Sequence, residues 1–116
     1  MAVLGITFKE NCPDIRNSKV VDLIRELESW NLEVKVSDPW ADPQEVGDEY
    51  GITLSSMHDL RDVSAIIVAV GHKEFRALSI SDFLKMCRNE RIVFGDIKSI
   101  YDRNELNSSG FNVFRL

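Results

Sequence analysis

Cysteine, glycine and long apolar runs are all scarce in this sequence. Its 116 residues include only two cysteines and six glycines. Cys12 and Cys87 show neither a CxxC pair nor zinc-ligand spacing, and no secretory signal precedes them. This argues against a disulfide framework and predicts a reducing, cytoplasmic location. No apolar stretch approaches the roughly 20 residues that a membrane-spanning helix needs, so no membrane association is predicted.

Positive charge is also in the minority. The chain has 14 Lys and Arg against 19 Asp and Glu, a formal net charge of −5. Non-specific binding to nucleic acids or to anionic membranes requires a basic face, so neither partner is predicted. A small anionic ligand stays open, because a local pair of cations is enough to hold a phosphate on an acidic protein.

Apolar runs alternate with amphipathic stretches along the chain. Strand patterns cover residues 3–8, 32–36, 65–70, 91–94 and 112–116. Helical patterns cover residues 20–30, 43–50, 79–88 and 101–106. This alternation predicts a single α/β domain spanning residues 1–116, with a Rossmann-like three-layer α/β/α architecture and a mainly parallel sheet of about five to six strands.

A charged turn follows the first predicted strand and contains Lys9, Glu10, Asp14 and Arg16. In doubly wound sheets, ligands bind beyond the carboxyl ends of the strands, beside helix N-termini. Two cations at such a place suit a pyrophosphate or a carboxylate. The alternative is that Lys9 and Arg16 are solvated charges paired with Glu10 and Asp14. Lys98 follows a later strand on the same edge and is expected to converge with Lys9.

Other signals of chemistry are incomplete. No glycine lies between Lys9 and Arg16, which excludes a GxGxxG turn or a P-loop there. Asp38 ends a strand where a Rossmann domain places its ribose-binding acid, but Asp38-Pro39 is more typical of a turn. His72 is expected to be a hydrogen-bonded loop histidine, or otherwise a polar contact of the ligand.

Catalytic and metal sites are not predicted. Cys12 has no histidine near it in the sequence to act as a base. Cys87 falls on the apolar face of a predicted helix and is interpreted as a core residue. His58 and Asp59 lack a third ligand nearby, so no metal is expected.

The first turn nevertheless carries a long motif. It has the pattern G-x-x-F-K-x-x-x-x-D-x-R-x-S followed by an apolar helix, formed here by Gly5, Phe8, Lys9, Asp14, Arg16 and Ser18. This pattern resembles the carboxyl-terminal, UDP-binding domain of the UDP-glucose/GDP-mannose dehydrogenase family. The likeness continues through VKVSDPWAD, AIIVAVGHKEF and VFGDIK. Within the family, these segments are most similar to the branch that oxidises UDP-N-acetylhexosamines, including UDP-N-acetylgalactosamine, for Vi-type and capsular polysaccharides and O-antigen.

The resemblance implies a three-part enzyme. An amino-terminal domain holds NAD, a central domain carries the nucleophilic cysteine and forms a homodimer or higher assembly, and the carboxyl-terminal domain closes over the UDP-sugar. The implied reaction oxidises C6 from alcohol to carboxylate with two NAD, through a thioester. Because a predicted core strand follows Met1 directly, we interpret the chain as a fragment containing only the third part, which is inactive alone.

Residue roles also follow from the resemblance. Phe8 and Lys9 correspond to the substrate-binding Phe-Lys pair, and Lys98 lies near a family position that is often arginine and contacts substrate. Arg16 corresponds to the arginine that reaches NAD on the other domain, and Asp14 is expected to orient Arg16 or to cap the helix. No catalytic residue is implied. The alternative function is a non-catalytic flavodoxin-like signalling or assembly module.

Overall fold

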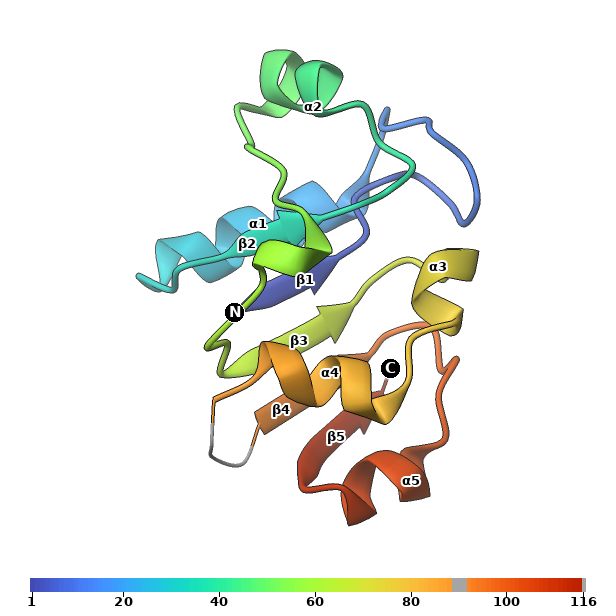
Figure 1. Ribbon diagram of the computed structural model, residues 1–116. Helices are drawn as coiled ribbons and strands as arrows, with labels where there is room; N and C mark the ends of the chain where they lie inside the picture. Colours follow the sequence, from blue (N-terminus) through green and yellow to red (C-terminus); the bar gives the residue numbers. More distant parts are fainter. Residues whose placement is uncertain (89–91, 116) are drawn as a thin grey trace.

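Five parallel strands form the centre of the molecule. The computed structural model describes residues 1–88 and 92–115, and in these ranges one sheet has the strand order β2-β1-β3-β4-β5 (Figure 1). The strands are β1 (Ala2–Leu4), β2 (Lys35–Ser37), β3 (Ala65–Val68), β4 (Ile92–Asp96) and β5 (Phe111–Arg115). All neighbouring strands are parallel, as predicted. Residues 91 and 116, which the strand patterns include, lie outside the described residues.

Helices cover both faces of the sheet, which confirms the three-layer architecture. They are α1 (Lys19–Ser29), α2 (Pro43–Tyr50), the 3-10 helix η1 (Met57–Asp59), α3 (Lys73–Arg76), α4 (Ile80–Met86) and α5 (Arg103–Ser108). Side chains of α1 and α2 share a core with β1, β2 and β3 on one face. Side chains of α3, α4 and α5 share a second core with the other face. In Figure 1, α4 lies in front of the sheet and α1 behind it.

Local capping explains where α2 begins and ends. The Asp42 carboxylate accepts the Gln44 N–H at 2.9 Å, and Pro43 occupies the first helical position. Gly51 ends the helix with a left-handed φ of 67°. Both boundaries match the sequence prediction, because an acidic cap, proline and glycine are local signals. The four-residue helix α3 was not predicted, since so short a helix leaves no periodic pattern.

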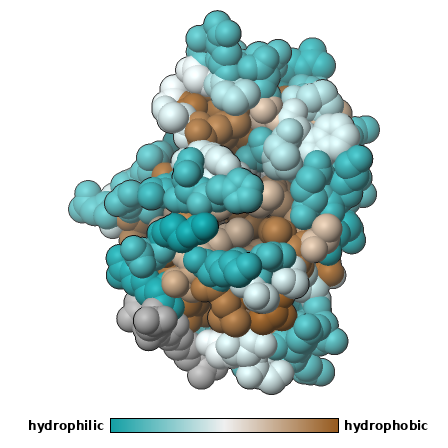
Figure 2. Space-filling view, viewed as in Figure 1, coloured by the Kyte–Doolittle hydropathy of each residue, from teal (hydrophilic) through white to brown (hydrophobic). Residues whose placement is uncertain are grey.

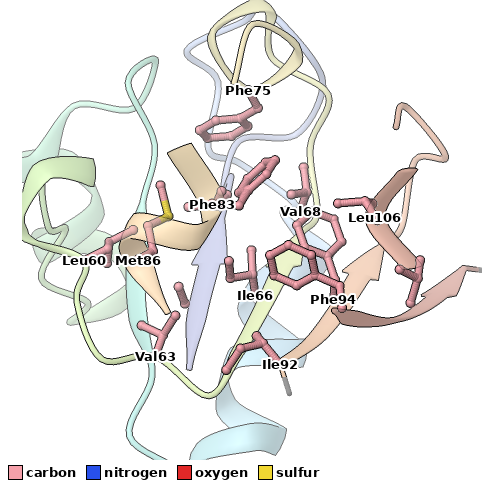
Figure 3. Close-up of a cluster of buried hydrophobic side chains, with 14 residues drawn as sticks. Leu60, Val63, Ile66, Val68, Phe75, Phe83, Met86, Ile92, Phe94 and Leu106 are labelled. Carbon is pink, nitrogen blue, oxygen red and sulfur yellow. The ribbon is translucent and has the colours of Figure 1, made fainter. Parts of the chain in front are cut away.

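Aromatic packing stabilises the second core. Phe83 from α4 meets Phe94 from β4 edge to face, with ring centroids 4.9 Å apart. Figure 3 shows these rings pointing into the same cluster as Ile66 and Val68 of β3. Fully burying a side chain of this size contributes about 1.5–3 kcal/mol. This packing therefore stabilises β3 and β4, and residues that follow these two strands line the candidate site.

The molecular surface is mixed in character. Hydrophilic residues cover α2 in the space-filling view, while apolar residues show between polar ones over the middle of the face that α4 occupies (Figure 2). Within residues 1–88 and 92–115, none of the helices combines the length and the apolar character that crossing a bilayer requires.

The two central strands stop earlier than predicted. The apolar run 3–8 predicts a strand to Phe8, but β1 ends at Leu4, because Gly5 has a φ of 101°. Likewise β3 ends at Val68 rather than Val70. The chain then leaves the sheet in two turns that lie next to each other, since β1 and β3 are paired neighbours.

Candidate functional site

A hollow of about 360 Å³ lies at the carboxyl edge of the sheet, where the strand order reverses between β1 and β3. Such reversal points are where α/β sheets bind ligands. Four segments line this switch-point hollow: the turn after β1, the start of α1, the segment after β3 and the turn after β4. Residues far apart in the sequence therefore meet here.

Positive charge dominates the switch-point hollow. Lys9, Lys19 and Lys98 line it, and Glu10 is an acidic residue on the same wall. The Glu10 carboxylate is already engaged, 3.1 Å from the Arg76 guanidinium. The start of α1 adds the partial positive charge of a helix N-terminus. The hollow is therefore suited to an anion.

The sequence prediction that Lys9 and Lys98 converge is confirmed, because both line the hollow. Phe8 lines it as well, with 58% of its surface exposed, and its N–H donates to the Asp14 carbonyl at 2.7 Å. Lys9 has no ion pair among residues 1–88 and 92–115. The alternative that Lys9 is paired with Glu10 or Asp14 is therefore wrong, although Lys9 is exposed to solvent as that alternative expected.

Arg16 lies apart from these residues. Its side chain is 82% exposed and does not line the hollow. It forms a two-pronged contact with Asp14, with Nε 3.0 Å from Oδ1 and Nη2 3.1 Å from Oδ2. This hydrogen bonding lowers the pKa of the Asp14 carboxyl. The structure thus confirms that Asp14 orients Arg16. It also confirms, for Arg16, the alternative of a solvated charge that is paired with an acidic residue.

Asp38 is buried beneath the turn that carries Phe8 and Lys9. Its side chain is fully buried, and it accepts four backbone N–H groups at 2.7–3.2 Å, from Ile6, Thr7, Trp40 and Ala41. It also lies 3.0 Å from His72 Nε2. A carboxylate with these partners has no free face for a ribose. The interpretation of Asp38 as a turn residue is confirmed.

His72 is also completely buried and connects the segments after β1, β2 and β3. It is the hydrogen-bonded loop histidine that the sequence predicts. The sequence did not predict that Thr7 and Asn11 would be its hydrogen-bond partners. The sequence offered one signal for these contacts, which is that Asp38 and His72 each come after a predicted strand. In the structure, those two strands lie on either side of β1.

Comparison with known proteins identifies the family. Residues 2–103 match the UDP-glucose/GDP-mannose dehydrogenase family, UDP binding domain. The chain belongs to this family. It is 40% identical over 103 residues to the UDP-N-acetyl-D-glucosamine 6-dehydrogenase of Pseudomonas aeruginosa, a match that covers 89% of this chain and 24% of that protein. It is 42% identical over 107 residues to protein CapL of Staphylococcus aureus, covering 92% and 25%.

Solved structures agree on the fold. The NDP-N-acetyl-D-galactosaminuronic acid dehydrogenase from Methanosarcina mazei superposes with a TM-score of 0.86 at 22% identity, covering 98% of this chain and 24% of that one. The UDP-N-acetyl-mannosamine dehydrogenase Cap5O from S. aureus superposes with a TM-score of 0.69 at 25% identity, covering 98% and 25%. The chain spans about a quarter of the length of these relatives.

Acid should lower the stability of the fold by protonating the Asp38 carboxylate. Burial acts to raise the pKa of its carboxyl, but hydrogen bonds from His72, Ile6 and Trp40 outweigh burial and hold the pKa below the ordinary 3.8. Because the unfolded chain then binds the proton more readily, Asp38 stabilises the fold above about pH 4 and loses this contribution as the pH falls further. Urea unfolding between pH 7 and pH 3 should show the stability gap between wild type and Asp38→Asn narrowing below pH 4. A gap that stays constant would contradict this assignment.

Neither Cys12 nor Cys87 lines the switch-point hollow. Burial raises the pKa of the Cys87 thiol to about 11, and its Sγ lies 3.1 Å from the Phe83 carbonyl oxygen. Cys12 is half-buried, and both cysteines are free thiols. In the part of the chain that the structure describes, no cluster of three or more His, Cys, Asp or Glu is placed to hold a metal.

Proposed function

We propose that this chain binds the UDP portion of a UDP-sugar, as the carboxyl-terminal domain of an NAD-dependent UDP-sugar 6-dehydrogenase. The observation that carries the proposal is the switch-point hollow. Three lysines line it at the reversal of strand order, and all of the residues that line it lie in the stretch that matches the family's UDP binding domain.

The chemistry of the lining suits a nucleoside diphosphate. The ammonium groups of Lys9 and Lys98 would bind the diphosphate oxygens as charge-assisted hydrogen-bond donors. The exposed ring of Phe8 offers an apolar face for the base or the sugar. The start of α1 adds unpaired N–H groups and a positive dipole end on the same side.

The chain's own residues do not fit a dinucleotide. The β1 turn has no glycine between Lys9 and Arg16, so the backbone lacks the close approach that a pyrophosphate needs in a Rossmann site. Asp38, at the ribose position, is fully buried and occupied by backbone donors. We therefore assign NAD to the amino-terminal domain of the full-length polypeptide. Arg16, exposed and oriented by Asp14, would reach it from this side.

The finer assignment follows the relatives. UDP-N-acetyl-D-glucosamine 6-dehydrogenases and CapL are about 40% identical to this chain, which supports a UDP-N-acetylhexosamine as substrate and a role in capsular or O-antigen polysaccharide synthesis. The full-length enzyme would be a cytoplasmic homodimer or higher assembly that oxidises C6 to a carboxylate. Its amino-terminal and central domains would supply the catalytic cysteine.

Replacing Lys9 by alanine should test the site. The 116-residue chain is titrated with UDP and followed through its backbone amide NMR signals. We expect shifts at Phe8, Lys9 and Lys98, and an affinity about tenfold or more lower in Lys9→Ala, because an ammonium–phosphate hydrogen bond contributes about 1.5–3 kcal/mol.

Lys85→Ala provides the matched control. Lys85 is an exposed lysine on α4 and does not line the hollow, so its removal changes the net charge equally. UDP affinity should be unchanged in this variant. Equal losses in both variants, or shifts confined to other surfaces, would contradict the proposed site.

A further inference from the structure

We propose that His72 is a positioning residue, whose neutral imidazole holds the Thr7–Asn11 turn in the conformation that presents Lys9 to the nucleotide. This inference rests on the proposed function of the switch-point hollow. His72 itself does not line the hollow and is completely buried. Its effect on a ligand must therefore act through the turn.

Both ring nitrogens of His72 bind the turn that contains Lys9. Nδ1 accepts the Asn11 N–H at 2.9 Å. Nε2 lies 3.0 Å from the Thr7 hydroxyl oxygen and 3.0 Å from Asp38 Oδ2. The turn is thus fixed two residues before Lys9 and two residues after it.

The partners define the protonation of the ring. A backbone N–H can only donate, so the Nδ1 atom that faces Asn11 carries no proton. The ring proton is on Nε2, where it faces two oxygen atoms. The Thr7 hydroxyl donates its own proton to the Lys9 carbonyl at 3.0 Å, so its oxygen is available to accept from His72. The hydrogen bonds therefore run in a consistent direction from the imidazole to the backbone of Lys9.

The turn contains a residue in a conformation that depends on its contacts. Asn11 has a φ of 52°, in the left-handed region that asparagine tolerates better than most residues but that still needs stabilising contacts. Its side chain is held on the other side, where Asn11 Oδ1 accepts the Lys73 N–H at 2.8 Å. Without the imidazole, the turn would populate other conformations. The apparent affinity for a ligand of Lys9 would then fall with the fraction of molecules in the competent conformation.

Two substitutions separate the ring's two roles. His72→Gln can retain a donor toward Asp38 and Thr7 but removes the acceptor for the Asn11 N–H, and His72→Asn does the reverse. We expect each variant to bind UDP about tenfold more weakly than the wild-type chain. Val113→Ala, on the far edge strand β5, serves as a control that creates a cavity without contacting the turn. It should reduce stability and leave UDP affinity unchanged.

A double-mutant cycle shows whether His72 acts through Lys9. In the His72→Gln background, Lys9→Ala should cost clearly less affinity than it costs in the wild-type background, because the ammonium is already misplaced. A merely structural role would instead give additive losses. Unchanged UDP affinity in His72→Gln, or full additivity of the two losses, would overturn the inference about His72. The proposed function of the hollow would still stand. Absence of UDP binding by the wild-type chain would overturn the proposed function, and this inference with it.

The protonation of the His72 ring nitrogens can be tested in the wild-type chain, without any substitution. In the ¹⁵N-labelled wild-type chain at neutral pH, His72 should show one unprotonated, pyridine-type nitrogen and one protonated, pyrrole-type nitrogen. His58 is the second histidine of the chain and serves as the internal reference. Two protonated nitrogens on His72, or a proton on Nδ1, would refute the proposed tautomer and the positioning role.

Discussion

Replacing Asp38 by alanine should lower the free energy of unfolding by about 3–5 kcal/mol, because several buried hydrogen-bond donors lose their shared acceptor. The carboxylate accepts four backbone N–H groups and contacts His72. Alanine would leave these donors without partners in a buried place, and each such donor costs about 1–3 kcal/mol. Because a domain of this kind is stable by only about 5–15 kcal/mol, much of its stability would be lost.

Asp42→Ala is the matched control for this prediction. Asp42 is also an aspartate that accepts a backbone N–H, at 2.9 Å from Gln44, but it is exposed at the start of α2. Loss of such a cap costs about 0.5–2 kcal/mol. Urea unfolding of both variants should give a clearly larger loss for Asp38→Ala. Equal losses would mean that the Asp38 hydrogen bonds contribute no more than an exposed helix cap.

The same contrast separates what the sequence can predict from what it cannot. The helix α2 was predicted to within a residue because its signals, Asp42, Pro43 and Gly51, act on their immediate neighbours. The ends of β1 and β3 were placed too late, because an apolar run shows burial and does not show where backbone pairing stops. Gly5 has no local pattern that marks it as a strand terminator.

For the candidate site, the sequence predicted where the lysines lie but not which residues form hydrogen bonds with one another. Parallel strands place their carboxyl ends on one edge, so the convergence of Lys9 and Lys98 follows without a structure. The contacts of Asp38 and His72 depend on the strand order, which places β2 and β3 on either side of β1. Alternation of strands and helices does not determine that order.

The strand order alone would not have assigned a function either. The order β2-β1-β3-β4-β5 is the flavodoxin-like one, which signalling modules share. A receiver domain needs an acidic pair after its first strand and a phosphorylatable aspartate after its third. Here Gly5 and Ile6 follow β1, and Ala69 and Val70 follow β3. The family match and the lysines of the hollow therefore favour nucleotide binding over a signalling or assembly role.

Gly5→Ala should also be strongly destabilising, because the turn that bears Lys9 depends on a close approach at this point. Gly5 has a φ of 101°, and a Cβ there would lie 2.6 Å from Val70 Cβ and 3.0 Å from the Val70 nitrogen. Adopting such a φ costs an L-residue about 1–2 kcal/mol. Overpacking against Val70 adds about 1–3 kcal/mol. We expect the free energy of unfolding, measured with urea, to fall by about 2–5 kcal/mol.

Two further variants divide this loss into its causes. Gly47→Ala places the same methyl group inside α2, where it meets no atom within 4 Å beyond its chain neighbours and the backbone of its own helix. It should stabilise the chain by about 0.5–1 kcal/mol. Combining Gly5→Ala with Val70→Ala shortens the side chain that the new methyl meets, so part of the overpacking should be recovered while the backbone strain remains. Partial rescue would show that steric contact between the ends of β1 and β3 shapes the turn. No rescue at all would place the cost in the left-handed backbone of residue 5 and in the contacts with Val70 Cβ and nitrogen, which alanine retains. A neutral Gly5→Ala would refute both causes.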